Sequence, residues 1–165
     1  MPGTMRRATT PASLYRLIYR SREVIAQVRH DAFTEEGLQR ELRAIVSGAR
    51  WRNKTENVTG ALLYSDAAFA QVLEGPREIV ERIFDRIAVD RRHADVTVLS
   101  FTPTHQRSFP DWSMAFFGQT PPVSADPTGH LAYGSVLTGP RVTTGSEVLR
   151  LLERVVQQED AWVGA

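Results

Sequence analysis

Two apolar runs separated by a short polar turn constrain this chain most, because they predict two adjacent antiparallel strands. The runs cover residues 58–64 and 69–74, and the turn-forming pair between them is Ser65 and Asp66. We therefore interpret the segment from Asn53 to Gly75 as the one around which the rest of the fold is organised.

The second run contains one polar side chain that an apolar strand face does not explain. In an extended strand Phe69, Gln71 and Leu73 share one face, while Ala70, Val72 and Glu74 share the other. A buried amide without partners costs about 1–3 kcal/mol. Gln71 therefore predicts a pocket that contains a hydrogen-bonding partner.

Composition narrows the class of protein. The length of 165 residues suits one domain, and a net charge of +1 gives no global electrostatic reason to expect nucleic acid or an anionic membrane as partner. The chain has no cysteine, which excludes disulfides, thiolate chemistry and cysteine-based zinc sites. No apolar run approaches the length of a membrane span, so we expect a cytoplasmic protein.

The remaining apolar periodicities predict helices and strands on both sides of the hairpin. Strands are expected at 14–20, 96–101 and 112–117, the last placing Trp112, Met114 and Phe116 on one face. Amphipathic helices are expected from a Thr34 cap to about Arg50, from 79 to about 90 and from 146 to about 160, with Asn53 just past the first helix and Pro76 at the start of the second.

This order of elements predicts an α+β fold. The sequence strand, helix, strand, strand, helix, strand, strand is that of a ferredoxin-like sandwich, with two helices on one face of a mixed five-stranded sheet. Residues 1–12 are expected to be disordered, 13–118 to form the domain and 119–145 to be an irregular linker. The helix within 146–165 either covers the other sheet face or pairs with another chain.

Few side chains are candidates for chemistry. Arg86 and Asp90 have the spacing of an i,i+4 ion pair on the second helix. His93 follows in a loop without the second ligand that a metal site needs, so a structural role is favoured. The chain has no P-loop, no G-x-S-x-G and no Ser-His-Asp spacing.

Taken together, six short motifs resemble those of the BLUF domain, a family of flavin-binding blue-light sensors. The resemblance covers residues 14–117. The motifs are L-I-Y-R-S at 17–21, A-R-W-R-N at 49–53, T-G-A-L-L-Y at 59–64, F-A-Q-V-L-E-G at 69–75, D-R-R-H at 90–93 and F-P-D-W-S-M at 109–114.

The resemblance implies a noncovalently bound FAD or FMN and a role for individual residues. Tyr19 matches the photoactive tyrosine, Gln71 the glutamine that bridges it to the flavin, and Asn53 an asparagine at the polar edge of the ring. Further cofactor-binding positions implied by the match are Phe69, Arg86, Ile87, Asp90 and His93. Trp112 and Met114 match a pair that exchanges places during signalling. Two departures stand out, since Arg52 replaces an Asn or His of many members and the loop 21–34 is about ten residues longer than expected.

These observations lead to a hypothesis and two alternatives. The hypothesis is a photoreceptor, not an enzyme, in which light drives electron and proton transfer from Tyr19 through Gln71. Its signal would leave through a partner protein or an oligomer interface, with the last helix as the candidate. The first alternative is a ferredoxin-like interaction module without flavin photochemistry. The second is a small acylphosphatase-like hydrolase, which no nucleophile or base supports.

Overall fold

The fold of this chain was analysed in a computed structural model that describes residues 14–25, 34–119 and 144–158. The elements are β1 (Leu14–Glu23), α2 (Glu35–Thr55), β2 (Thr59–Ser65), β3 (Ala68–Pro76), α3 (Arg77–Ala88), β4 (His93–Thr104), β5 (Ala115–Gln119) and α5 (Gly145–Gln158). The predicted disordered lead, most of the predicted linker and positions 159–165 lie outside the described residues.

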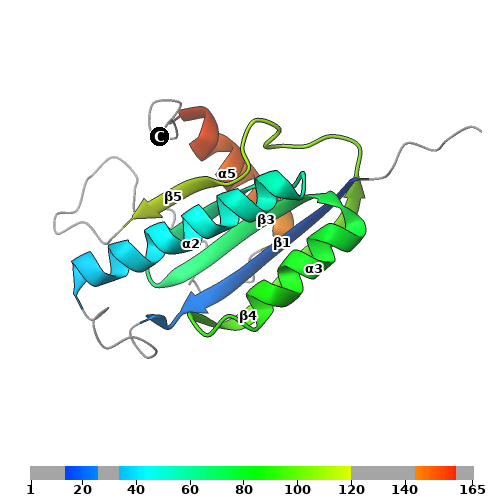
Figure 1. The fold of residues 1–165 in the computed structure, drawn as a ribbon. Helices are drawn as coiled ribbons and strands as arrows, with labels where there is room; N and C mark the ends of the chain where they lie inside the picture. Colours follow the sequence, from blue (N-terminus) through cyan, green and yellow to red (C-terminus); the bar gives the residue numbers. More distant parts are fainter. Residues whose placement is uncertain (1–13, 26–33, 120–143, 159–165) are drawn as a thin grey trace, which may run out of the picture.

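The strands form one five-stranded sheet in the order β4-β1-β3-β2-β5. All neighbours are antiparallel except β2 and β5, which run parallel with Ala61 opposite Ala115. Helices α2 and α3 lie side by side on one face of this sheet, and α5 lies on the other (Figure 1). The predicted ferredoxin-like α+β fold with a mixed five-stranded sheet is therefore confirmed.

The sheet separates two apolar layers, as strand alternation requires. On the α2/α3 side, Leu17, Tyr19, Phe69 and Leu73 pack with Leu42, Val46, Val80 and Ile83 of the helices. On the α5 side, Ile18, Ala70 and Val72 pack with Val148, Leu151, Leu152 and Val155. The apolar stripe of α5 thus covers the second sheet face, while a role of this helix in dimerisation stays a prediction.

Helix α2 begins as predicted but ends later. Thr34 is its N-cap, and the Thr34 hydroxyl accepts a hydrogen bond from the Gly37 amide at 3.0 Å. The helix continues to Thr55, so the prediction that Asn53 follows its end is wrong. Asn53 lies in the last turn and is 1% exposed, because this position faces the sheet while its polar neighbours face solvent.

The hairpin between β2 and β3 turns one residue later than predicted. Ser65 belongs to β2 and pairs with Ala68, which leaves Asp66 and Ala67 as the two loop residues. Both have positive φ, 49° and 58°, as expected for a tight hairpin turn whose twist matches that of the flanking strands.

Other boundaries also shift from those predicted. Strand β1 extends into the predicted loop 21–34, whose residues 26–33 lie outside the described part of the chain. Pro76 is the N-cap of α3, not its first residue, and the helix ends at Ala88. Strand β4 covers His93–Thr104 and is therefore longer at both ends than the predicted strand 96–101.

The last strand differs most from the prediction. It begins at Ala115, so Trp112 and Met114 precede it in an irregular segment. The two side chains consequently do not share a face. Trp112 packs with the layer under α5, whereas Met114 is buried in the layer under α2 and α3 together with Phe116.

Candidate functional site

A cavity of about 210 Å³ opens where α2 and α3 cover the sheet. All eight residues predicted to bind a cofactor line it: Tyr19, Asn53, Phe69, Gln71, Arg86, Ile87, Asp90 and His93. Six further residues line the cavity that were not predicted from the sequence to belong to the site: Ile45, Ala49, Arg52, Leu62, Ile83 and Arg92. Six elements of the fold, β1, α2, β2, β3, α3 and β4, therefore meet around one space.

Tyr19 and Gln71 are brought together by strand register. They are directly opposite each other on β1 and β3, and a shift in the β1–β4 register begins between Ile18 and Tyr19. Residues opposite each other on adjacent antiparallel strands point to the same face. The Tyr19 hydroxyl donates a hydrogen bond to Gln71 Oε1, which supplies the partner that the buried amide requires.

The phenol of Tyr19 is buried among aromatic rings. The side chain is buried beneath the Phe84 ring, whose centroid is 5.5 Å away, and beside the His93 ring at 6.2 Å. Burial, with a further contribution from the Asp90 charge, raises the pKa of Tyr19 well above its ordinary value. Burial therefore favours the protonated phenol over the phenolate.

The second half of the Gln71 amide contacts the segment before β5. Gln71 Nε2 donates to Met114 Sδ at 3.5 Å, and Asn53 Nδ2 donates to the neighbouring Ser113 carbonyl at 2.7 Å. Arg50 Nε donates to the Met114 carbonyl at 3.0 Å. Met114 is not among the cavity-lining residues, but its sulfur is hydrogen-bonded directly to Gln71, which is one of them.

Asp90 lines the cavity, but its ion-pair partner differs from the one predicted. Because α3 ends at Ala88, Asp90 is not on the helix, and its carboxylate pairs with Arg92 at 2.6 Å rather than with Arg86. Arg92 also donates through Nε at 3.0 Å and through its backbone amide at 2.9 Å. Burial alone raises the pKa of Asp90, but the Arg92 hydrogen bonds and charge, with His93, hold this pKa below its ordinary value.

His93 ties three elements together at the edge of the cavity. Its Nε2 is 2.5 Å from the Ile87 carbonyl oxygen at the end of α3, and its Nδ1 is 2.7 Å from Ser21 Oγ on β1. A carbonyl can only accept, so Nε2 carries the proton, and in the neutral ring Nδ1 accepts from the serine hydroxyl. The expectation of a structural role for His93 agrees with these contacts.

The donor set fits a flat heteroaromatic ring with one polar edge. Ile45, Ile83 and Ile87 supply apolar contact area, while Asn53 and Gln71 supply amide groups that both donate and accept. A pattern in the sequence points to the missed apolar residues, because Ile45 and Ala49 continue the apolar stripe of α2 and Ile83 that of α3.

The described ranges show neither a metal centre nor a membrane-spanning helix. These ranges contain no group of three or more His, Asp or Glu residues that could hold a metal ion. No helix among them is both long and apolar enough to cross a membrane.

Comparison with known proteins gives a family match and several similar proteins. A family profile described as "BLUF: Sensors of blue-light using FAD" matches residues 14–115. The chain is similar to the photoactivated adenylate cyclase subunit beta of Euglena gracilis, with 39% identity over 75 residues, or 45% of this chain and 9% of that protein.

Two further similarities extend over more of the chain. The blue light- and temperature-regulated antirepressor BluF of Escherichia coli (strain K12) is 35% identical over 101 residues, which is 61% of this chain and 23% of that protein. The solved structure of the BlsA photo-activated state matches with a TM-score of 0.57 and 34% identity, covering 66% of this chain and 71% of that chain. The chain thus spans less than a quarter of the length of these curated relatives.

Proposed function

The chain belongs to the BLUF family of blue-light sensors that use FAD, and from this premise we propose that Tyr19 and Gln71 are its photoactive pair. The observation that carries the proposal is the hydrogen bond from the Tyr19 hydroxyl to Gln71 Oε1 at the wall of the cavity. Both side chains are buried, which keeps bulk water away from the proton that they share.

The cavity residues divide into four groups by the role that each can take toward a flavin. Phe69 and Ile87 offer apolar surface to the ring system. Asn53 and Gln71 offer amide groups to its polar edge, and Arg52 and Arg86 offer cationic groups to more polar parts of the cofactor. Asp90 and His93 act by fixing the cavity wall through their bonds to Arg92, Ile87 and Ser21.

Light sensing requires that Tyr19 lose an electron only after light has been absorbed. A flavin held in this cavity would supply a blue-light chromophore and an acceptor for one electron from the Tyr19 phenol. Tyr19 holds its proton firmly in the dark, because burial disfavours the phenolate. After loss of an electron the phenol becomes strongly acidic, and its proton moves from Oη toward Gln71 Oε1. The amide must then rearrange its bonds, including the one from Nε2 to Met114 Sδ.

The output is proposed to be an interaction and not a reaction of this chain. No paired nucleophile and base lies among the cavity residues, and α5 packs on the sheet face opposite the cavity. We assign the signal to a change in how α5 or the neighbouring surface meets a protein partner or a second copy of the chain. A net charge of +1 gives no support to direct nucleic-acid binding, and we place the protein in the cytoplasm.

An absorption spectrum of the purified protein tests the proposal, before and after blue light. Wild-type protein should contain flavin and show a light-induced red shift of its spectrum. Tyr19→Phe and Gln71→Leu should bind flavin but lose the shift. Tyr64→Phe is the matched control and should keep the shift, since this second buried tyrosine makes a tilted ring contact with Phe69, at 5.2 Å between centroids, without lining the cavity.

Two outcomes would contradict the proposal. An intact red shift in Tyr19→Phe would refute the assigned electron donor. A colourless protein that cannot be reconstituted with FAD or FMN would favour the alternative of an interaction module without flavin photochemistry.

A further inference from the structure

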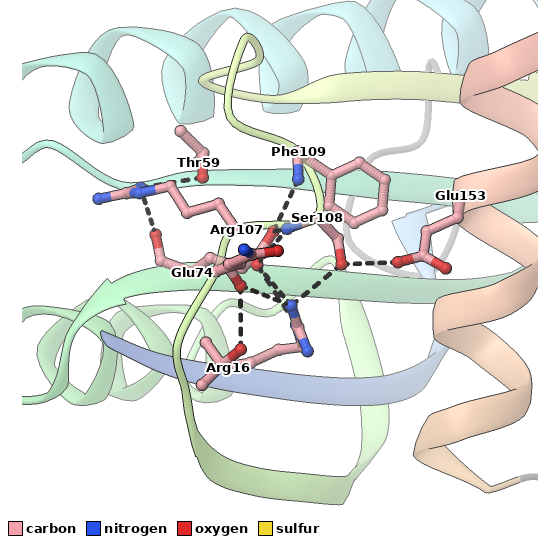
Figure 2. Close-up of polar contacts among 9 residues, drawn as sticks. Arg16, Thr59, Glu74, Arg107, Ser108, Phe109 and Glu153 are labelled. Atoms are coloured by element: carbon pink, nitrogen blue, oxygen red, sulfur yellow. Dashed lines mark hydrogen bonds and ion pairs between the residues drawn. The ribbon is translucent and has the colours of Figure 1, made fainter. Parts of the chain in front are cut away.

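A buried carboxylate lies on the sheet face opposite the cavity. Glu74 is on β3, three residues after Gln71, and is 0% exposed. Its carboxylate accepts hydrogen bonds from Arg16 Nη2 at 3.0 Å, from the Ser108 amide at 2.8 Å and from the Phe109 amide at 3.0 Å (Figure 2). Glu74 therefore fixes the start of the segment that leads to Met114.

Arg107 holds the same segment from its other side. Its Nη1 donates to the Glu74 backbone carbonyl and to Thr59 Oγ1, both at 2.9 Å, and its Nη2 donates to the Asn57 carbonyl at 2.9 Å. Side chain and backbone of residue 74 thus both bind the segment. The start of the segment therefore cannot move far without disturbing the end of β3.

The other end of this segment meets the photoactive pair. Met114 Sδ accepts from Gln71 Nε2, and the Trp112 carbonyl accepts from the Gly60 amide of β2 at 3.0 Å. Residues 107–114 therefore connect Gln71 on one face of β3 with Glu74 on the other. A displacement of Met114 must be absorbed within this short stretch or passed on to Ser108.

Ser108 links the segment to α5. Its hydroxyl accepts from Arg16 Nη2 at 3.0 Å and donates to Glu153 Oε1 at 2.6 Å, and Figure 2 shows Glu153 reaching from the helix toward it. The hydroxyl has one proton, and with Arg16 on its acceptor side that proton is directed to Glu153. Within the described residues Ser108 is the hydrogen-bond partner that holds the Glu153 side chain.

We propose that Glu74 and Ser108 are positioning residues that couple the Gln71–Met114 contact to α5, with the Ser108–Glu153 hydrogen bond as the link that light weakens. This inference rests on the proposed function for its light dependence. The coupling itself depends only on the fold, since residues 107–114 contact both faces of the sheet.

Hydrogen exchange of the α5 amides in the full flavin-bound chain tests the link. In wild type, blue light should speed exchange in α5. Ser108→Ala should speed it about tenfold in the dark, the effect of losing one charge-assisted hydrogen bond, with no further change on illumination. Its flavin red shift should persist, because Tyr19 and Gln71 are untouched. Ser108→Thr, which keeps a hydroxyl, should restore the light response.

The control is Arg154→Ala on the exposed side of α5, which should retain the light response of wild type. Glu153→Ala should behave as Ser108→Ala does. A light-induced change in α5 exchange of wild-type size in Ser108→Ala would overturn the proposed link. So would a wild-type protein with a normal red shift and no change in α5 exchange.

A second arm in the dark separates this inference from the photochemistry. Met114→Ala removes the contact to Gln71 without light and should speed α5 exchange in the wild-type background. It should have little additional effect in Ser108→Ala, as a double-mutant cycle detects for coupled sites. Independent, additive effects would overturn the coupling whether or not flavin is bound, whereas a missing red shift would count only against the proposed function.

Discussion

Removal of the buried carboxylate in Glu74→Ala should cost about 3–5 kcal/mol of unfolding free energy, the range for breaking a buried ion pair. The magnitude follows from what the substitution leaves behind. Two backbone donors, the amides of Ser108 and Phe109, lose their acceptor, at about 1–3 kcal/mol each. Arg16, whose side chain is 16% exposed, loses its anionic partner, although it keeps its bond to the Gln106 carbonyl.

Burial, not distance, sets this magnitude, and a second ion pair in the same protein provides the comparison. Arg77 Nε and Glu81 Oε1 are also 3.0 Å apart, but their side chains are 58% and 42% exposed. Glu81→Ala should therefore cost about 0.5 kcal/mol or less. Urea unfolding followed by circular dichroism measures both variants. A Glu74→Ala loss within about 1 kcal/mol of the Glu81→Ala loss would refute the reasoning.

Three further predictions concern other parts of the fold. Because burial raises the pKa of Tyr19 above 10.0, the unfolded chain binds fewer protons than the folded chain above that pH. The contribution of Tyr19 to stability, which is constant below pH 10.0, should therefore fall by up to about 1.4 kcal/mol per pH unit. Tyr19→Phe should make the fall shallower in alkaline denaturation, and an unchanged slope would contradict this account. Thr34→Ala should cost about 1 kcal/mol in thermal unfolding through loss of the α2 cap, whereas Thr34→Ser should cost far less. Gly60→Ala should cost about 3 kcal/mol or more, because its methyl group would lie 2.0 Å from the Val72 carbonyl oxygen, and wild-type stability in this variant would show that the two strands separate easily.

The sequence predicts the cavity face of the sheet well because strand alternation is a local property. Gln71 is placed on one face with Phe69 and Leu73 by neighbours two positions away, and in the structure the same alternation puts Tyr19 opposite Gln71 on the cavity face. The same alternation places Glu74 on one face with Ala70 and Val72. A carboxylate buried on that apolar face needs a cation as partner. Arg16 has the matching face on the adjacent strand.

Positions at the ends of elements could not be predicted in this way. Asn53 lies inside α2 because the polar residues around it continue the helix on its solvent side, and the chain changes direction only at Asn57, with a φ of 56°. The segment before β5 is bent, so alternation does not apply to Trp112 and Met114. Its path is set by bonds to distant parts of the chain, such as Gly60 on β2.

Strand β3 presents two separate sets of side chains, and this gives a practical means of altering the protein. Phe69, Gln71 and Leu73 belong to the cavity layer, while Ala70 and Val72 belong to the layer under α5. A combinatorial library restricted to the first set would vary the absorption spectrum and the dark recovery of the sensor. A library restricted to the second set would vary how α5 packs on the sheet. Natural divergence has the same freedom, so relatives could keep one set while adapting the other to a new partner.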